Sequence, residues 1–217
     1  MDGQDFKQLE YSILGYHGPT ILFIQAEGET NYSMNDTHPN GGFFGAFTSS
    51  TWKQSKKFYG DGDSFLFQVT PSFQLYHPTY QKSTSTNFMY FNPSHGLGFG
   101  GSQEKPRLFI PKSFDDLGSA SSFDTSYTYS MGNLLPDHYM HMEQFHIHAM
   151  EVWGVGGDTV IEAALKKQTE YRDLQTSNIH KVRTIKDKSM FIQDMQTGMI
   201  ESKMYVHRKQ TDGRANI

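Results

Sequence analysis

The feature that most constrains this fold is a change of pattern at Asp158. From Asp158 to Thr197 the chain has neither glycine nor proline, and apolar residues recur at helical spacing. One stripe holds Ala164, Tyr171, Leu174, Asn178, Val182 and Ile185, with Ile179 beside it. The pattern predicts one helix, or two helices joined near Thr176 and Ser177.

Before Asp158 the chain is a series of short apolar runs separated by turn-forming residues. Aromatic residues make up 14% of the chain, which favours strands over a helical bundle. The runs predict a helix at 5–14 and strands at Thr20–Gln25 (buried), Phe43–Thr48, Ser64–Val69, Tyr76–Tyr80, Asn87–Phe91, Leu108–Ile110 and Gln144–Trp153. Loops are predicted at 26–42 and 112–126, and a connector at Trp52–Lys57. The expected class is α+β, mainly β, with a few flanking helices and a C-terminal helical extension.

Charge is divided along the chain. Residues 166–217 hold 11 Lys or Arg and 6 Asp or Glu, whereas residues 1–165 hold 8 and 17. A basic tail on an acidic domain favours contact with an acidic partner or with the domain itself, and a solvated helix is the alternative. Nucleic-acid binding is not expected, because the domain is acidic, its aromatic residues sit at the spacing of a strand core, and only the tail is basic.

Cysteine is absent, which rules out disulfides and zinc-thiolate sites and fits a reducing compartment. Residues 1–5 have no basic region and no apolar run, so no signal peptide is expected. No stretch approaches the ~18 apolar residues of a spanning helix, so membrane insertion is not expected either. We expect a cytoplasmic location, with a ciliary one or the cytosolic face of an organelle as alternatives.

Histidines are the first candidates for chemistry: His138, His141, His146 and His148, with Glu143 among them. On a strand His146 and His148 share a face, a spacing that can chelate a divalent ion. Phe145 and Ile147 take the opposite face, so the histidines also fit the solvent side of an antiparallel strand. We expect surface histidines and no metal or other cofactor, with a pH-sensitive contact as a further alternative.

Carboxylates are the second candidates. Glu151 lies in a strand expected to be half-buried, where a carboxylate needs a partner and a raised pKa would indicate function. The pairs Asp61/Asp63 and Asp115/Asp116 lie in turn-forming contexts instead. No nucleophile-elbow or P-loop motif is present, so no catalytic residue is predicted.

The glycine run Gly96–Gly101 fits G-x-G-x-x-G. A dinucleotide site needs a helix that opens within this motif, and Pro106 would end such a helix early. We expect a tight bend at which strands approach closely.

Several motifs occur in an order that resembles the TLDc domain of oxidation-resistance proteins. They are Gly15–Thr20, Phe44–Phe47 with Trp52, Gly60 with Phe65–Phe67, Gly96–Gly101, Thr128 with Tyr129, Phe145 with Ile147, and Glu151–Gly154. The resemblance covers roughly residues 6–155 and implies a two-sheet antiparallel β-sandwich with no established active site. It predicts a domain at 1–157, N-terminally short or completed by another chain, and a helical extension with a basic tail at 158–217.

The resemblance also implies a non-enzymatic protein-interaction module, similar to regulators that bind the vacuolar-type proton pump and protect against oxidative stress. One alternative is a structural subunit of a cytoskeletal or ciliary assembly. Another is a metal- or carboxylate-dependent enzyme that uses Glu151 or the face of His146 and His148. The predicted partner-binding residues are Lys181, Arg183, Lys186, Lys188, Met190 and Phe191. Their charges would speed the encounter with an acidic surface, and the apolar groups would supply affinity.

Overall fold

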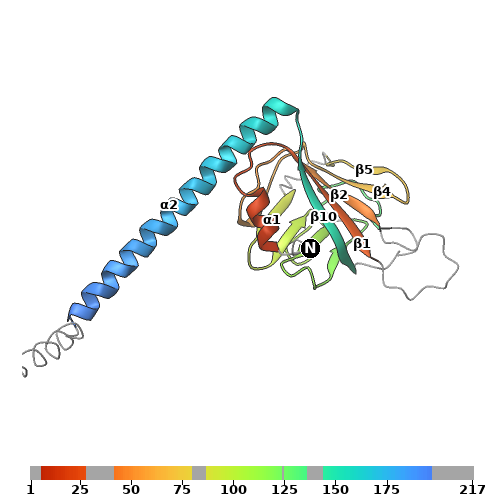
Figure 1. The fold of residues 1–217 in the computed structure, drawn as a ribbon. Helices are drawn as coiled ribbons and strands as arrows, with labels where there is room; N and C mark the ends of the chain where they lie inside the picture. The colour runs from red at the N-terminus through yellow and green to blue at the C-terminus, as the bar shows by residue number, and fades with distance from the viewer. Residues whose placement is uncertain (1–5, 28–41, 80–86, 124, 136–143, 197–217) are drawn as a thin grey trace, which may run out of the picture. The chain divides into compact units, whose positions relative to one another are not determined.

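The computed structural model describes residues 6–27, 42–79, 87–123, 125–135 and 144–196, with the side chains at 191 and 194–196 excepted (Figure 1). The helices are α1 (Phe6–Ile13) and α2 (Asp158–Gln196). The strands are β1 (Thr20–Glu27), β2 (Phe43–Thr48), β3 (Ser55–Tyr59), β4 (Phe65–Thr70), β5 (Gln74–Tyr76), β6 (Met89–Asn92), β7 (Gly96–Phe99), β8 (Leu108–Pro111), β9 (Gly118–Ala120) and β10 (Gln144–Gly154). The predicted α+β, mainly β class is therefore confirmed.

The ten strands are antiparallel and follow one hydrogen-bonded order, β3-β6-β7-β8-β9-β10-β1-β2-β4-β5. Strand β10 joins the two halves of this order. Its first residues, Gln144 and Phe145, pair with β9, and its remainder pairs with β1 from His146 to Gly154. The predicted division into two sheets is not confirmed, since one shared strand makes the order continuous, and it stays a prediction.

One hydrophobic core holds side chains from both halves of the sheet. Leu22, Ile24 and Phe44 come from one half, and Phe91, Leu97 and Ile110 come from the other. Trp52, 2% exposed, lies between them, with its ring edge-on to the rings of Phe91 and Phe99 at 6.3 Å. Phe44 and Phe145 also meet edge-on, at 5.2 Å. The packing of aromatic residues thus explains their high content in this chain.

Four strands differ from the sequence prediction, and one of them, β7, occupies part of the predicted bend at Gly96–Gly101. Strand β3 occupies part of the predicted connector Trp52–Lys57, because an edge strand with exposed Lys56 and Lys57 carries no apolar run. Strand β9 lies in the predicted loop 112–126 and has only three residues. The strand predicted at Tyr76–Tyr80 lies earlier, as β5, and beyond it Pro78 makes an isolated bridge.

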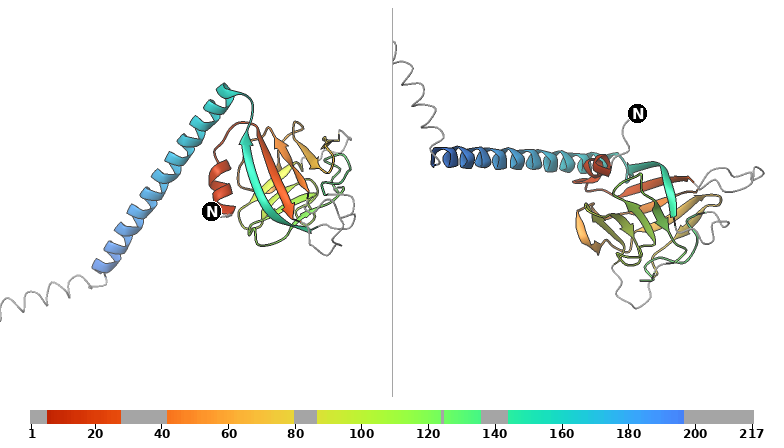
Figure 2. Two further views of the ribbon diagram at one scale, coloured as in Figure 1. Left: turned by 45° about the vertical axis from the view of Figure 1, so that its right-hand side comes forward. Right: turned by 90° about the horizontal axis from the view of Figure 1, so that it is seen from below.

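The helices match their predictions closely. The buried Phe6 of α1 contacts Phe91 at 5.5 Å and Phe114 at 6.0 Å. Figure 2 shows the short helix α1 lying beside the strands. Helix α2 is one continuous helix, so the two-helix alternative is wrong. In its first turns Ala164 is buried, and the side-chain amide of Gln168 donates to the carbonyl oxygens of Ser12 and Leu14 at 2.6 and 3.2 Å.

The chain divides into two compact units, Met1–Thr169 and Glu170–Ile217. The first contains the sheet, α1 and the start of α2. In the described part of the second, every side chain from Asp173 to Met190 is exposed.

Candidate functional site

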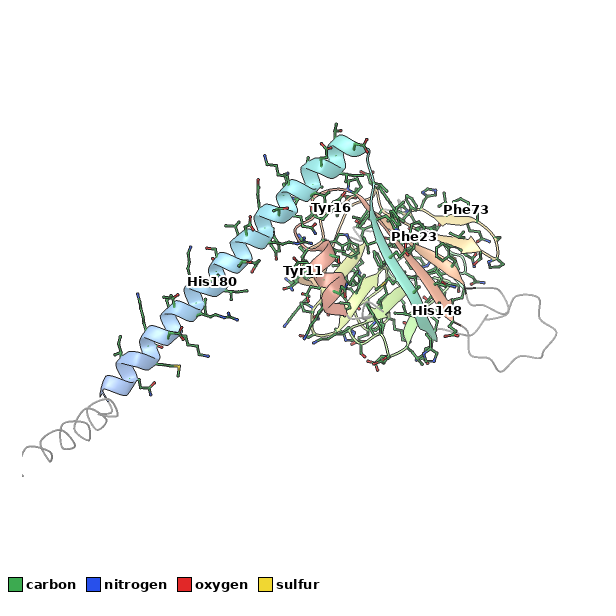
Figure 3. The ribbon with its side chains drawn as sticks, in the orientation of Figure 1. Tyr11, Tyr16, Phe23, Phe73, His148 and His180 are labelled. Carbon is green, nitrogen blue, oxygen red and sulfur yellow. The ribbon has the colours of Figure 1, made fainter. Side chains whose placement is uncertain are left out.

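The predicted alternation of β10 is confirmed at its start. Phe145 and Ile147 are buried, whereas His146 and His148 are exposed. Figure 3 labels His148. His148 Nδ1 lies 4.0 Å from Glu27 Oε2, and Glu27 pairs with His146 across the strands. Among the described residues, no three His, Asp or Glu side chains lie close enough to hold a metal ion together. His138, His141 and Glu143 lie outside the described residues. The two strand histidines are therefore surface residues.

Glu151 differs from its prediction. Its side chain is exposed, not half-buried, and its Oε2 accepts a hydrogen bond from the indole N–H of Trp153 at 2.8 Å. Trp153 is 59% exposed on the same face of the strand. An exposed carboxylate that holds a neighbouring indole has none of the burial that general acid–base chemistry would use.

The glycine run forms strand β7 and the turn after it. Gly98 lies opposite Tyr90, and a Cβ at Gly98 would lie 2.3 Å from the Tyr90 ring. No helix opens within or after the run, since β8 follows directly. The close approach of strands is confirmed, although the expected bend is confined to Gly100 and Gly101.

The turn before β4 is organised by Asp61. Its carboxylate accepts hydrogen bonds from the hydroxyls of Ser49 and Ser50 at 2.6 and 2.9 Å and from the amide of Asp63 at 3.2 Å. Partial burial opposes ionisation of Asp61, but these three donors outweigh it and lower its pKa. The amide contact is the turn role predicted for Asp61 and Asp63. Asp115 and Asp116 are exposed, and the amide of Asp116 closes a turn onto the Ser113 carbonyl.

A buried arginine is a feature that the sequence did not indicate. The guanidinium of Arg107 donates to the carbonyl oxygens of Tyr129 and Ser130 through Nη1 and to that of Gly132 at 2.8 Å through Nη2. It also lies 4.9 Å from the centre of the Tyr76 ring. Arg107 thus fixes the segment 129–132 by satisfying its carbonyls, which is a structural role.

The predicted basic cluster lies on α2. Lys181, Arg183, Lys186 and Lys188 are all exposed, and Met190 is 56% exposed. Phe191 lies on the same helix, and its side chain is outside the description. Val182 and Ile185, also exposed, add apolar surface to the cluster.

Sequence reasoning also missed an outward aromatic surface, which we call the open face. It consists of Ile21, Phe23, Phe43, Phe47, Phe65, Phe67, Leu75 and Trp153, on strands β10, β1, β2, β4 and β5. Phe23 stacks on Phe43 at 5.5 Å, and Phe47 stacks on Phe65 at 4.9 Å (Figure 3 labels Phe23). Phe67 is buried, and the other seven side chains are half-buried or exposed.

The run Thr20–Gln25 was predicted to be a buried strand because it is apolar throughout. In the structure its residues alternate: Leu22 and Ile24 enter the core, while Ile21 and Phe23 lie on the open face. The missed signal was the four consecutive apolar residues Ile21–Ile24, since an ordinary antiparallel strand with one solvated face alternates apolar and polar residues.

Neither described helix combines the length and the hydropathy that a membrane crossing needs.

Comparison with known proteins gives a family match over most of the chain. The family model of the TLDc domain matches residues 1–156. The MTOR-associated protein MEAK7 of Xenopus laevis is 31% identical over 159 residues, which cover 71% of this chain and 30% of that protein. The human protein of the same name is 30% identical over 161 residues, 72% of this chain and 30% of that protein.

A third relative is shorter. Oxidation resistance protein 1 of Yarrowia lipolytica is 32% identical over 160 residues, which cover 69% of this chain and 63% of that protein. The chain therefore spans about a third of the MEAK7 proteins and under two thirds of the fungal protein. The residues that the family model matches, 1–156, include the whole sheet.

Proposed function

Because this chain belongs to the TLDc domain family, we propose that it is a non-enzymatic protein-interaction module of the TLDc type. The candidate chemical groups support this role. Glu151 is exposed and bonded to Trp153, and His148 Nδ1 lies 4.0 Å from Glu27 Oε2. No three His, Asp or Glu side chains of the described residues could hold a metal ion together. The matched motifs supply core and turn residues, such as Trp52 and Gly98, which build a scaffold for binding.

The proposed partner is the cytosolic sector of a vacuolar-type proton pump, and the proposed outcome is protection against oxidative stress. Two relatives carry names that fit a regulatory role: one is an oxidation resistance protein, and the other is associated with MTOR. The proposed location is accordingly the cytoplasm, with the cytosolic face of an organelle as the place of action.

The observation that carries the binding proposal is the exposed basic cluster of α2. Lys181, Arg183, Lys186 and Lys188 lie within eight positions of one helix, next to the exposed Met190. Four cations beside apolar groups match an acidic protein surface, because charge steers the encounter and apolar contact slows dissociation. We propose that these residues, together with Phe191, bind the partner.

Affinity capture of the tagged chain from its own cells tests this proposal. We expect pump subunits in the eluate of the unaltered chain and their loss when Lys181, Arg183, Lys186 and Lys188 are all changed to Glu. In a matched control variant, four other exposed lysines that lie on the sheet unit are changed to Glu, and we expect it to retain the pump subunits. These lysines are Lys56, Lys57, Lys105 and Lys112. Absence of pump subunits from the unaltered capture contradicts the partner, and equal loss in both variants contradicts the site.

The second candidate is a structural subunit of a cytoskeletal or ciliary assembly. The observation that favours it is the unit Glu170–Ile217, whose described side chains leave a long helix face exposed, with Leu174, Val182 and Ile185 along it. Such an extension is suited to packing on a neighbouring subunit. Limited proteolysis distinguishes the two states: this role predicts cleavage within 186–217 in the isolated chain and protection in the assembly. Protection in the isolated chain contradicts it.

A further inference from the structure

We propose that the open face is a second docking surface, and that it binds a partner helix whose apolar side chains are flanked by Lys or Arg. This inference rests on the proposed role as an interaction module, and it names a site and a partner chemistry separate from the basic cluster of α2.

The open face is continuous across five strands. One row of cross-strand neighbours runs Trp153, Ile21, Phe47, Phe65, and the next runs Glu151, Phe23, Gly45, Phe67, Leu75. In the second row Gly45 has no side chain, and the Phe67 ring fills its place, 2.7 Å from where a Cβ would stand. The Phe67 ring then meets Phe23 edge-on at 5.5 Å. The rings thus form one packed apolar layer, which no part of the described segments covers completely on its outer side.

Apolar side chains of this kind are seldom left in water over a contiguous area unless they bind something. The core does not need them, since Leu22, Ile24 and Phe44 fill the inner side of the same strands. Helix α1 packs elsewhere: its buried Phe6 contacts Phe91 of β6, in the other half of the sheet, and Phe114, which follows β8.

The charge around the open face selects a basic partner. The strands that form it carry two carboxylates, Glu27 and Glu151, and no Lys or Arg. Asp61, in the turn that leads into Phe65, adds a third, and like any Asp with an ordinary or lowered pKa it is ionised at neutral pH. Trp153 presents an exposed indole whose N–H is engaged by Glu151, so its ring can receive a cation.

A second copy of this chain is a poorer occupant. In a two-fold dimer the same patch meets itself, so carboxylates would lie on both sides of the interface with no Lys or Arg of the open-face strands to neutralise them. A helix with flanking cations neutralises them instead. Five strands at a spacing of about 4.8 Å span about 19 Å, which a helix of about 13 residues at 1.5 Å per residue crosses.

The test uses the full chain and an 18-residue helical peptide made of Leu on one face and Lys on the other. The readout is fluorescence, since Trp52 is buried and Trp153 is the exposed tryptophan of the two in the sequence. We expect a saturable blue shift of the Trp153 emission as the peptide covers it. A peptide with Glu in place of Lys is expected to leave the Trp153 emission unchanged. If that peptide binds elsewhere on the chain, the Trp153 emission does not report it.

Two variants and two matched controls locate the site. We expect Leu75→Ser and Glu151→Gln each to raise the Kd of the Lys peptide about tenfold, because each removes one half of the recognition. Met131→Ser and Glu104→Gln, exposed positions away from the open face, leave the Kd within about twofold. The proposal is overturned if the Lys peptide causes no emission shift, or if the Glu peptide causes an equal shift. It is also overturned if the control variants raise the Kd of the Lys peptide as much as Leu75→Ser and Glu151→Gln do. A blue shift of the Trp153 emission that appears without peptide, as the protein concentration is raised, also overturns it, because a second copy of the chain would then cover the open face.

The result is independent of the pump proposal. If the Lys peptide binds the open face while no pump subunit is captured, the docking surface stands and the proposed partner fails. If pump subunits are captured equally by Leu75→Ser and Glu151→Gln and the peptide does not bind, the proposed function stands and the docking surface fails.

Discussion

The indole N–H of Trp52 donates a hydrogen bond to Thr20 Oγ1 at 2.8 Å, and both residues are buried. This bond fixes the segment after β2 against the start of β1. It also allows a polar atom of the large Trp52 side chain to enter the core without a desolvation penalty.

Thr20→Val keeps the shape of the side chain and leaves the Trp52 N–H without its partner. We expect the free energy of unfolding to fall by about 1–3 kcal/mol, which is the cost of an unsatisfied buried donor. Urea unfolding at neutral pH measures it. Thr176→Val on the exposed part of α2 is the control, with an expected change within about 0.5 kcal/mol. Equal effects at both positions would contradict the importance of the Trp52 bond.

Two buried tyrosines should respond in opposite directions to loss of the hydroxyl. Among the described residues Tyr90 Oη has no hydrogen-bond partner, and burial raises its pKa. The single O–H of Tyr76 has two acceptors within reach, Gln74 Oε1 at 2.9 Å and the Asn133 carbonyl oxygen, and donates to either. We expect Tyr90→Phe to be neutral or stabilising by about 1 kcal/mol and Tyr76→Phe to be destabilising by about 1–2 kcal/mol. Thermal unfolding compares them, and a Tyr90→Phe protein less stable than Tyr76→Phe would refute the assignment.

Arg107→Met retains an unbranched apolar side chain but removes the donors to the carbonyls of Tyr129, Ser130 and Gly132. We expect a loss of about 3 kcal/mol or more, because several buried acceptors lose their donors at once. Chemical unfolding of the variant measures the loss. The exposed Lys112→Met is the matched control and should change stability by less than about 0.5 kcal/mol. Comparable losses would mean that the Arg107 contacts contribute little.

Asp61 should make the fold sensitive to acid. Its pKa is lowered in the folded protein, so the unfolded state binds the proton more readily. The stabilising contribution is present above the unfolded pKa of about 4 and is lost as the pH falls through the lower folded value. We expect Asp61→Asn to lower the urea midpoint at pH 7 and to reduce the further drop between pH 5 and pH 3. If that drop is undiminished, other groups determine the acid sensitivity.

The boundary of the sheet unit can be tested by truncation. A chain ending at Thr169 keeps Ala164 and the bonds from Gln168 to Ser12 and Leu14, and we expect it to unfold at the same temperature as the full chain. A chain ending at Gly157 loses these contacts, and we expect it to be about 2–4 kcal/mol less stable. Equal stability of the two truncations would show that the start of α2 contributes nothing to the fold.

The sequence was sufficient where local pattern decides structure. Strand β2 was predicted with its observed bounds, because Phe43–Thr48 is apolar and has turn residues before it. Strand β3 was missed because its lysines face solvent at an edge, and β9 because three residues carry no period. The burial of Glu151 was predicted wrongly, since its apolar neighbours Met150 and Val152 say nothing about which side of the sheet is covered. The open face left a local signal in the consecutive apolar residues Ile21–Ile24, but its extent across five strands depends on strand order, and the environment of Arg107 depends on contacts with the distant segment 129–132.

The pairing of β10 with both β9 and β1 has a consequence for how the protein is made. Thr20 of the first strand pairs with Gly154 of the last, so the sheet stays in two unconnected halves until nearly all of the domain has left the ribosome. Until then the edge of β1 that pairs with β10 is unpaired, and the apolar side chains on both faces of this half of the sheet are exposed to water. Nascent chains in this state aggregate or recruit chaperones. Closure over so long a stretch of chain is also entropically slow. Biogenesis should therefore be the step at which this protein is most dependent on its cellular surroundings.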